Sequence, residues 1–350
     1  MKPGLGIVSV GMVTAVGLDA PSSCAAMRAR LDGFQETRFI GPGGLGVVGA
    51  PVPLPRNWIG QKRMVHLAAG AVADALSAAP GAEVGLALIL CLAEGTRPGR
   101  PVTDPESFLR DLAAIVSLPA RTRIQLIEHG RPSGFAALNR ARKLLADRAA
   151  EHVLILGVDS YLTVASMAHY LDAERVLGPG NSNGFIPGEA AAAVLVGSSG
   201  ALRLTGLGLA REPAFLYNGL EQDGGHLPLR GDGMTTAYRA AMEEANVDLA
   251  HVEYRIGDLI GEQFFFKQST LASLRLERGR IPFQDFWSPG ENLGNVGAAV
   301  VPIMIGMALA AAVKGYAPGS PVLIEASGDD GACGAAVLHG VRSAAGARAA

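Results

Sequence analysis

The chain has 350 residues, of which 49% are hydrophobic and 18% charged, so it is long enough and apolar enough to bury a large core. A net charge of −2, without interleaved basic and aromatic clusters, excludes the electrostatic signature of a nucleic-acid-binding protein. Cys24, Cys91 and Cys333 are widely spaced, which predicts neither a disulfide framework nor a zinc site. We expect a cytoplasmic protein that needs no cofactor and no metal.

The first half of the sequence alternates helical and strand-like patterns. The opening MKPGLGIVSVGMVTAVG is broken by glycines and lacks a small-residue cleavage signature, so it predicts a first strand rather than a signal peptide. VHLAAGAVADALSAA then precedes VGLALILCLAEG, and FAALNRARKLLADRAA precedes HVLILGVDS. This alternation predicts an α/β protein with a largely parallel sheet.

The stretch GRPSGFAAL, Gly130 to Leu138, lies between the apolar run IQLIEH and the helical pattern NRARKLL. It predicts a strand that turns sharply into a helix, which is where many enzymes hold a nucleophile at a helix N-terminus. A cysteine or serine is expected at such a bend. Arg131 and Pro132 occupy it instead, and Ser133 follows.

The second half repeats the order of the first. DALSAAPGAEVGLALIL, from Asp74, and AAMEEANVDLAHVEYRIGDLI, from Ala240, each read as a helix, a polar connection and a strand. HVLILGVDS followed by GEAAAAVLVGS likewise parallels PVLIEASGDD followed by GACGAAVLHG. We therefore predict a diverged internal duplication, with halves at 1–210 and 211–350 that form one compact unit.

One segment near the C-terminus, Val296 to Val313, has 18 residues without a charge, at the lower limit for a membrane span. It is rich in alanine and contains Pro302. A helix buried in a large α/β core is apolar on every side for a different reason, and no second apolar segment of this kind accompanies it. We expect a core helix and no membrane span.

Five motifs, in this order, resemble those of thiolase-fold condensing enzymes, most closely the type II β-ketoacyl-acyl-carrier-protein synthases. They are GIVSVGMVTAVGLDA, GVDSYL, GPGNSNGFIPGEAAAAVLV, RGDGMTTAYRAAMEEANVDLAHVEY and GENLGNVGAA. The resemblance covers nearly the whole chain. It implies a five-layered αβαβα fold with two duplicated halves, a dimer, and condensation of acyl thioesters carried by an acyl carrier protein, in fatty acid or polyketide biosynthesis.

The resemblance also assigns functional positions, and each carries an unexpected residue. The family's nucleophilic cysteine falls on Arg131, and its two catalytic histidines fall on Asp258 and Glu291. A family lysine falls on Phe286, and the gating phenylalanine falls on Asp330. Because a guanidinium stays protonated and cannot attack a thioester, these replacements predict a pseudoenzyme that has lost condensing activity.

The changed positions predict a buried salt-bridge cluster at the former catalytic centre. In the family the nucleophile and both histidines converge, so Arg131 is expected to meet Asp258 and Glu291, with Asp330 close by. A guanidinium offers five donors in a fork that suits carboxylates. The alternative is an open pocket in which Arg131 receives an anionic ligand.

Several other residues invite a functional interpretation beside a structural one. Ser133 is a candidate nucleophile, although a hydroxyl at a helix start more often bonds a free backbone N–H. His129 is a candidate base in the pocket, but a lone histidine beside an apolar strand is usually structural. Cys91 in LALILCLAEG is expected to be a small buried hydrophobe, and Glu189 in IPGEAAAAVLV to satisfy turn amides. The basic run RNWIGQKR, Arg56 to Arg63, is either a solvated helix start or a docking surface for an acidic carrier protein.

Three functions follow from these readings. The first is a non-catalytic subunit, which forms a homodimer or a heterodimer with an active synthase through the apolar edge segment TRIQLIEH from Thr122. The second is an acyltransferase or hydrolase that acts on acyl thioesters through Ser133. The third is a binding protein that recognises an anion through Arg131.

Overall fold

The computed structural model describes residues 5–116, 118–119, 122–218, 226–277 and 283–341. Ten strands form one continuous sheet in the order β5-β4-β6-β7-β1-β8-β12-β11-β9-β10. Strands of the first half are β1 (Leu5–Val13), β4 (Leu86–Cys91), β5 (Arg123–Ile127), β6 (His152–Ser160) and β7 (Glu189–Gly197). Strands of the second half are β8 (Leu202–Arg211), β9 (Tyr254–Gly257), β10 (Asp285–Trp287), β11 (Val322–Ser327) and β12 (Ala332–Gly340).

The two groups of five strands correspond one to one. In the first, β4 pairs parallel with β5 and β6, while β7 pairs antiparallel with β6 and β1. In the second, β9 pairs parallel with β10 and β11, while β12 pairs antiparallel with β11 and β8. The predicted duplication of halves is therefore visible in the topology.

One expectation about the sheet needs adjustment. The sheet is mixed rather than largely parallel, because β7 and β12 each run back beside the strand that precedes them. In addition, β8 pairs with β12 along its length but with β1 only at Leu202–Leu204. Strand β8 therefore pairs mainly with the second half, and residue 210, after which we divide the halves, lies next to its last residue.

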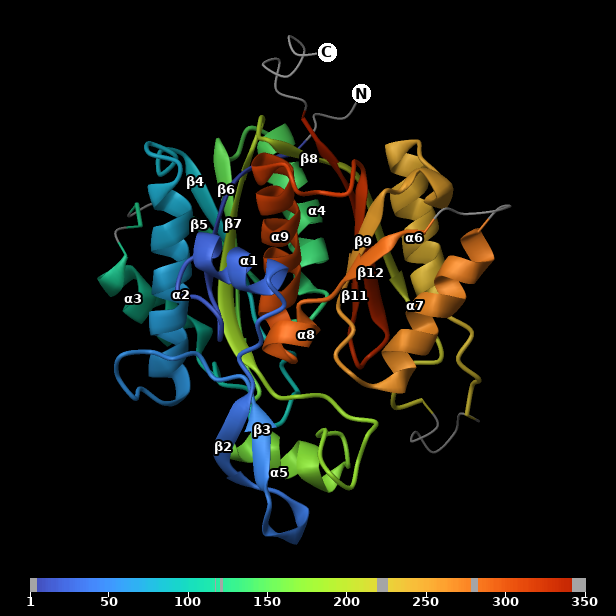
Figure 1. Ribbon diagram of the computed structural model, residues 1–350. Coiled ribbons are helices and arrows are strands. Elements are labelled where there is room, and N and C mark those ends of the chain that lie inside the picture. The colour runs from blue at the N-terminus through green and yellow to red at the C-terminus, as the bar shows by residue number, and fades with distance from the viewer. Residues whose placement is uncertain (1–4, 117, 120–121, 219–225, 278–282, 342–350) are drawn as a thin grey trace.

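Helices complete five layers, α-β-α-β-α, as Figure 1 shows. The outer helices of the first half are α2 (Gly60–Ser77) and α3 (Pro105–Ile115), and those of the second half are α6 (Asp232–Ala245) and α7 (Gln263–Leu276). The central layer holds α4 (Ser133–Ala146) and α9 (Val300–Lys314). Shorter elements are α1 (Ala20–Arg28), β2 (Gln35–Ile40), η1 (Pro42–Gly44), β3 (Gly46–Gly49), α5 (Val164–Asp172), η2 (Leu249–His251), α8 (Gly290–Leu293) and η3 (Gly297–Ala299).

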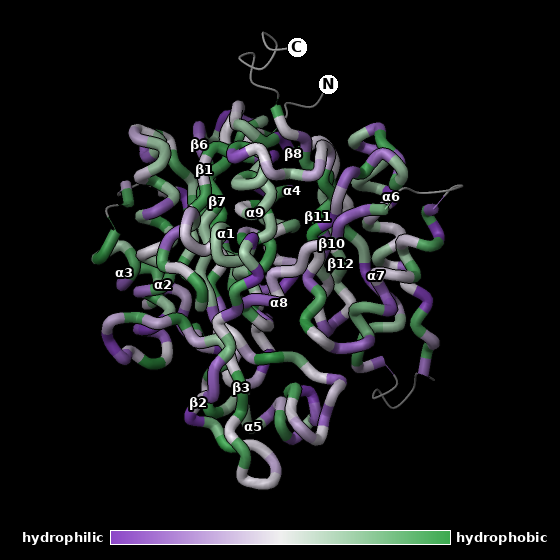
Figure 2. Tube along the Cα trace, in the orientation of Figure 1, coloured by the Kyte–Doolittle hydropathy of each residue, from purple (hydrophilic) through white to green (hydrophobic). Residues whose placement is uncertain are grey.

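Helix α9 is the core helix predicted from its uncharged sequence. The window Gly297–Lys314 is apolar enough to cross a membrane by length and composition, but 78% of it is buried inside the protein. It packs against strands of both halves and against α4, so its residues from Val300 to Leu309 are buried on every face, and only its last turn reaches the surface. Figure 2 shows the same distribution, with apolar strands in the interior and most hydrophilic residues at the periphery. Pro302 lies in the first turn, where its missing N–H costs no helical hydrogen bond.

Candidate functional site

The predicted strand-to-helix turn is present between β5 and α4. Gly130 has a left-handed φ of 59°, a conformation that glycine adopts without strain, and this is why the bend favours glycine. A Cβ atom there would also lie 2.0 Å from Oε1 of Glu94, so the end of that side chain would have to move. The following residue, Arg131, immediately precedes Pro132 and the first turn of α4. The turn therefore places Arg131 at the start of a helix of the central layer, between the two halves of the sheet.

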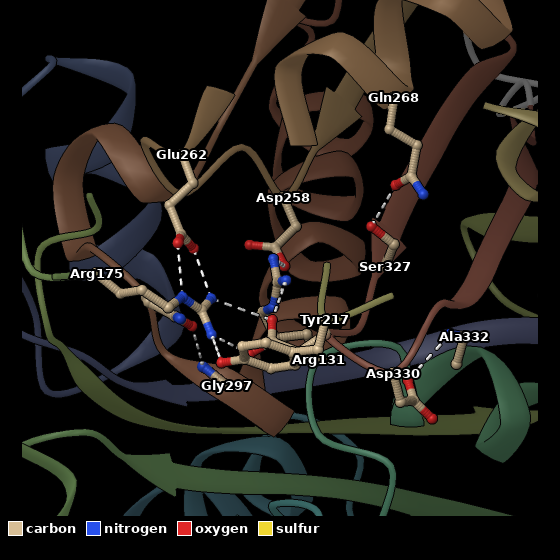
Figure 3. A network of polar contacts seen from close by, with 12 residues as sticks. Arg131, Arg175, Tyr217, Asp258, Glu262, Gln268, Gly297, Ser327, Asp330 and Ala332 are labelled. Atoms are coloured by element: carbon tan, nitrogen blue, oxygen red, sulfur yellow. Dashed lines mark hydrogen bonds and ion pairs between the residues drawn. The ribbon is translucent and has the colours of Figure 1, made fainter. Parts of the chain in front are cut away.

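The Arg131 side chain is enclosed, with only 1% of its surface exposed. Its Nη1 lies 3.1 Å from Oδ2 of Asp258, which directly follows β9, and its Nη2 lies 3.2 Å from Oδ1 of Asp329, in the turn after β11. The guanidinium carbon also lies 3.9 Å from the centre of the Phe265 ring in α7, within cation–π range. Two carboxylates and one aromatic face thus surround the cation, as Figure 3 shows in part for Asp258.

A second arginine extends this site. Nε and Nη2 of Arg175 each donate to one oxygen of Glu262 at 2.7 Å, and Nη1 donates to Oδ2 of Asp329 at 2.6 Å. The hydroxyl of Tyr217 accepts a further hydrogen bond from Arg175 (Figure 3). Asp329 joins the two arginines. We call Arg131, Arg175, Asp258, Glu262 and Asp329 the arginine cluster.

Electrostatics in the arginine cluster are set by burial and by its two cations. Burial raises the pKa of Asp258 above its ordinary value, and Arg131 only partly opposes this effect. Burial also acts on Asp329, but Arg175 and Arg131 together hold the pKa of that carboxyl below its ordinary value. Both guanidinium groups keep their charge, because the nearby carboxylates raise the pKa of each despite burial. The cluster is therefore an ion-pair network that depends on both arginines.

Two acids that the sequence predicts beside Arg131, Glu291 and Asp330, lie outside the arginine cluster. Glu291 is exposed on α8 and lines a separate pocket with Phe286, so its predicted place beside Arg131 is wrong. Glu291 lies in the short helix α8, which precedes η3 and α9, and it lines a pocket beside α1 instead of contacting Arg131. Asp330 is also outside the cluster. Its Oδ1 accepts from the backbone N–H of Ala332 at 3.0 Å and closes the turn, so the inward position falls to the preceding residue, Asp329.

The candidate nucleophile Ser133 has a structural environment. Its side chain is fully buried, and its Oγ accepts a hydrogen bond from the backbone N–H of His129 at 3.1 Å. The hydroxyl thus bonds a backbone N–H, as the structural interpretation predicts, although the N–H belongs to the preceding turn rather than to the helix. Among the described residues, no base is hydrogen-bonded to this hydroxyl.

The three thiols are buried, free and poorly suited to nucleophilic chemistry. Burial raises the pKa of Cys24 and of Cys91 to about 12, and raises that of Cys333 further. All three therefore stay protonated at neutral pH, whereas a reactive cysteine needs its thiolate form. Cys91 lies inside β4, as its apolar surroundings predict.

Glu189 has the structural role expected of it. Its Oε1 accepts from the backbone N–H of Val52 and from Nε of Arg63, both at 2.9 Å, and its Oε2 accepts from the Ser160 hydroxyl at 3.2 Å. Arg63 is consequently tied into the interior. It is not part of an exposed basic surface, which leaves Arg56 and Lys62 as the exposed cations of that run.

The sequence interpretation missed three members of the cluster: Arg175, Glu262 and Asp329. Arg175 precedes the GPGNSNG loop, and Glu262 follows Asp258 by four residues in the same glycine-containing loop. Their contacts join positions 87 to 198 residues apart, which no local pattern reports. The available signal was the position of these residues in the sequence, since Glu262 and Asp329 lie near the assigned positions Asp258 and Asp330, and Arg175 lies just before a family motif.

No protein-family model and no curated protein matches this sequence. Solved structures do match over 97% of the chain. One holds the ketosynthase ApeO in complex with its chain length factor ApeC from Xenorhabdus doucetiae, with a TM-score of 0.77, 13% identity and 98% of that chain covered. This chain has the ketosynthase fold.

Two further structures support the assignment of this thiolase-like ketosynthase fold. The ishigamide ketosynthase/chain length factor matches with a TM-score of 0.70 and 18% identity. AntDE:AntF, a type II polyketide synthase acyl-carrier protein in complex with its ketosynthase, matches with a TM-score of 0.79 and 14% identity. Each covers 97% of this chain and 100% of the matched chain. At these identities the likeness concerns the fold, and the residues of the site must be judged by themselves.

Proposed function

We propose that this chain is a non-catalytic subunit of the ketosynthase fold that acts by assembly, as a homodimer or as the partner of an active condensing enzyme. The observation that carries the proposal is the buried Arg131 at the start of α4, the position that the family resemblance assigns to the nucleophile. A guanidinium is neither a nucleophile nor a base at physiological pH. Asp258 stands where an imidazole is expected, and its carboxylate is engaged by Arg131.

A structural feature of the chain supports pairing. Strand β5 lies at one end of the ten-stranded sheet, so among the described residues no other strand pairs with its outer edge. Ile124 on this strand is 44% exposed. An exposed apolar edge strand is a ready template for a strand of another subunit. The ketosynthase and chain length factor of Xenorhabdus doucetiae form a complex, which makes a heterodimer the arrangement that we favour.

Co-purification tests the assembly. The tagged chain is co-expressed with an active ketosynthase from the same organism, and the mass of the product is measured by light scattering at micromolar concentration. We expect a dimeric species that Ile124→Asp disrupts, because the substitution places a charge on the pairing edge. Ile40→Asp is the matched control, since Ile40 is also an exposed isoleucine but lies on β2. A monomer that recruits no ketosynthase would refute the proposal.

An activity assay separates this subunit from an enzyme. The isolated chain should form no condensation product from malonyl and acyl thioesters of an acyl carrier protein, while its complex with an active partner should form one. Product from the isolated chain clearly above a heat-killed control would contradict the proposal. We disfavour an acyltransferase or hydrolase that uses Ser133, because that side chain is fully buried. We also disfavour an open pocket in which Arg131 binds an anionic ligand, because two carboxylates already pair with Arg131.

The exposed part of the basic run is our candidate docking surface for the acyl carrier protein. Arg56 and Lys62 are exposed at the start of α2, and both charges can attract an acidic partner. Charge reversal of both residues should weaken carrier-protein binding by the assembled complex, with a loss that shrinks at high salt. Unchanged binding would remove this surface from the proposal.

A further inference from the structure

A second pocket does not include Arg131. It is lined by residues between 24 and 30 and by residues between 286 and 316. Helix α1 lies against α9 (Figure 1). Two hydrogen bonds tie the segment after α1 to α8. Nδ2 of Asn292 donates to the carbonyl of Leu31 at 2.7 Å, and the N–H of Gly33 donates to the carbonyl of Asn292 at 2.9 Å. A pocket of about 250 Å³ opens between these elements and β10.

The lining of this pocket combines aromatic and sulfur-containing side chains with the polar residues Ser288, Glu291 and Asn292. Trp287 from β10 forms part of the lining, and its ring packs 4.7 Å from that of Tyr254 and 6.3 Å from that of Tyr316. The ring of the preceding residue, Phe286, lies on the other face of β10, against Arg255. Cys24 and Met307 contribute sulfur atoms, which are polarisable and pack well against aromatic rings. This surface suits a flat apolar group.

The mouth of the pocket carries unpaired positive charge. Arg28 and Arg30 are exposed there, and the guanidinium of Arg28 lies 4.2 Å above the Tyr316 ring. A neighbouring hollow of about 270 Å³ shares Arg28 and Tyr316 and adds Lys314. Within the described ranges, none of these three cations forms an ion pair. Glu291 is the one carboxylate that lines either hollow, so the mouth has an excess of positive charge.

We propose that this pocket binds a small aromatic carboxylate, with its ring between Trp287 and the sulfur-containing side chains and its carboxylate against Arg28 and Arg30. The arginine fork is suited to a carboxylate, and Arg28 is already oriented by the Tyr316 ring. Pockets for drug-sized ligands measure roughly 300–1,000 Å³, so a volume near 250 Å³ fits a single ring with a short acidic group. The site is independent of the arginine cluster and of the proposed assembly.

The chain offers a specific probe, because Trp58 and Trp287 are its two tryptophans. In a Trp58→Phe background, the remaining fluorescence comes from the pocket. Benzoate and phenylacetate are titrated into this protein, with benzamide and phenylacetamide as uncharged analogues of the same shape. We expect a saturable change for the acids, and Arg28→Gln should weaken their binding by at least about tenfold, because a charge-assisted hydrogen bond is lost.

Arg239→Gln is the matched control, since it removes the same charge from an exposed position on the outer helix α6. It should leave the affinity for the acids unchanged. The inference is overturned if neither acid gives a saturable response up to about 10 mM, if the amides bind as well as the acids, or if Arg28→Gln has no more effect than the control.

Discussion

Removal of Arg131 is the sharpest test of the arginine cluster, because it takes away one partner of a buried pair and leaves the other in place. In Arg131→Ala, Asp329 keeps its contacts with Arg175. The carboxylate of Asp258 loses Arg131, its hydrogen-bond partner, and remains buried. One uncompensated carboxylate is therefore the expected consequence of the substitution.

The magnitude follows from that single stranded charge. Breaking a buried ion pair by removing one partner costs roughly 3–5 kcal/mol of unfolding free energy. Asp258 can relieve part of this cost by taking up a proton, since burial already raises its pKa above the ordinary value of 3.8. With the arginine gone, the folded state binds this proton more readily than the unfolded state, so the cost should grow as pH rises.

The assay is urea unfolding at pH 5 and pH 8, followed by circular dichroism. The matched control is Arg100→Ala, which breaks the partly exposed pair with Glu128 and should cost no more than about 1 kcal/mol. A cost for Arg131→Ala of that same size would refute the argument. A second refutation is available: Arg131→Met with Asp258→Leu should be more stable than Arg131→Met alone, because the double variant leaves no unpaired carboxylate.

Three other outcomes are expected. Burial raises the pKa of Glu325 to about 8 from its ordinary value of 4.5. Between these two pH values the folded state holds a proton that the unfolded state lacks. The free energy of unfolding should therefore fall by about 1.4 kcal/mol for each unit by which the pH rises. Glu325→Gln should flatten this slope in unfolding measurements from pH 5 to pH 8, and parallel slopes would contradict the assignment. Arg131→Cys should show no condensing activity in a malonyl and acyl thioester assay, because Asp258 supplies no imidazole; product formation by this single variant would show that the rest of the centre is intact. The unmodified chain and Ser133→Ala should both show only background acyl labelling by carrier-protein thioesters. Ser133→Ala should lower the free energy of unfolding by about 1 kcal/mol, because the hydrogen bond to the His129 N–H is lost. Labelling of the unmodified chain that Ser133→Ala abolishes would instead identify Ser133 as a nucleophile.

The sequence determined the elements of this fold because their patterns are local. The apolar run His152–Ser160 predicts a strand and forms β6 over the same residues. Most of the uncharged segment from Val296 to Val313 forms the core helix α9, which begins at Val300. The position of Arg131 at the turn before α4 also follows from neighbouring residues, since Gly130 permits the left-handed bend that a strand-to-helix turn needs.

Tertiary structure alone decided which charged residues meet. Asp329 and Asp330 are adjacent and chemically identical, yet one contacts both arginines and the other closes its own turn, because the backbone of that turn directs only the first side chain inward. Arg175 and Glu262 join the cluster from loops that the sheet order brings together, while Glu291 is carried to another pocket by α8. Periodicity reports the face that a residue occupies, whereas an ion pair requires two distant segments to meet at a distance of about 3 Å.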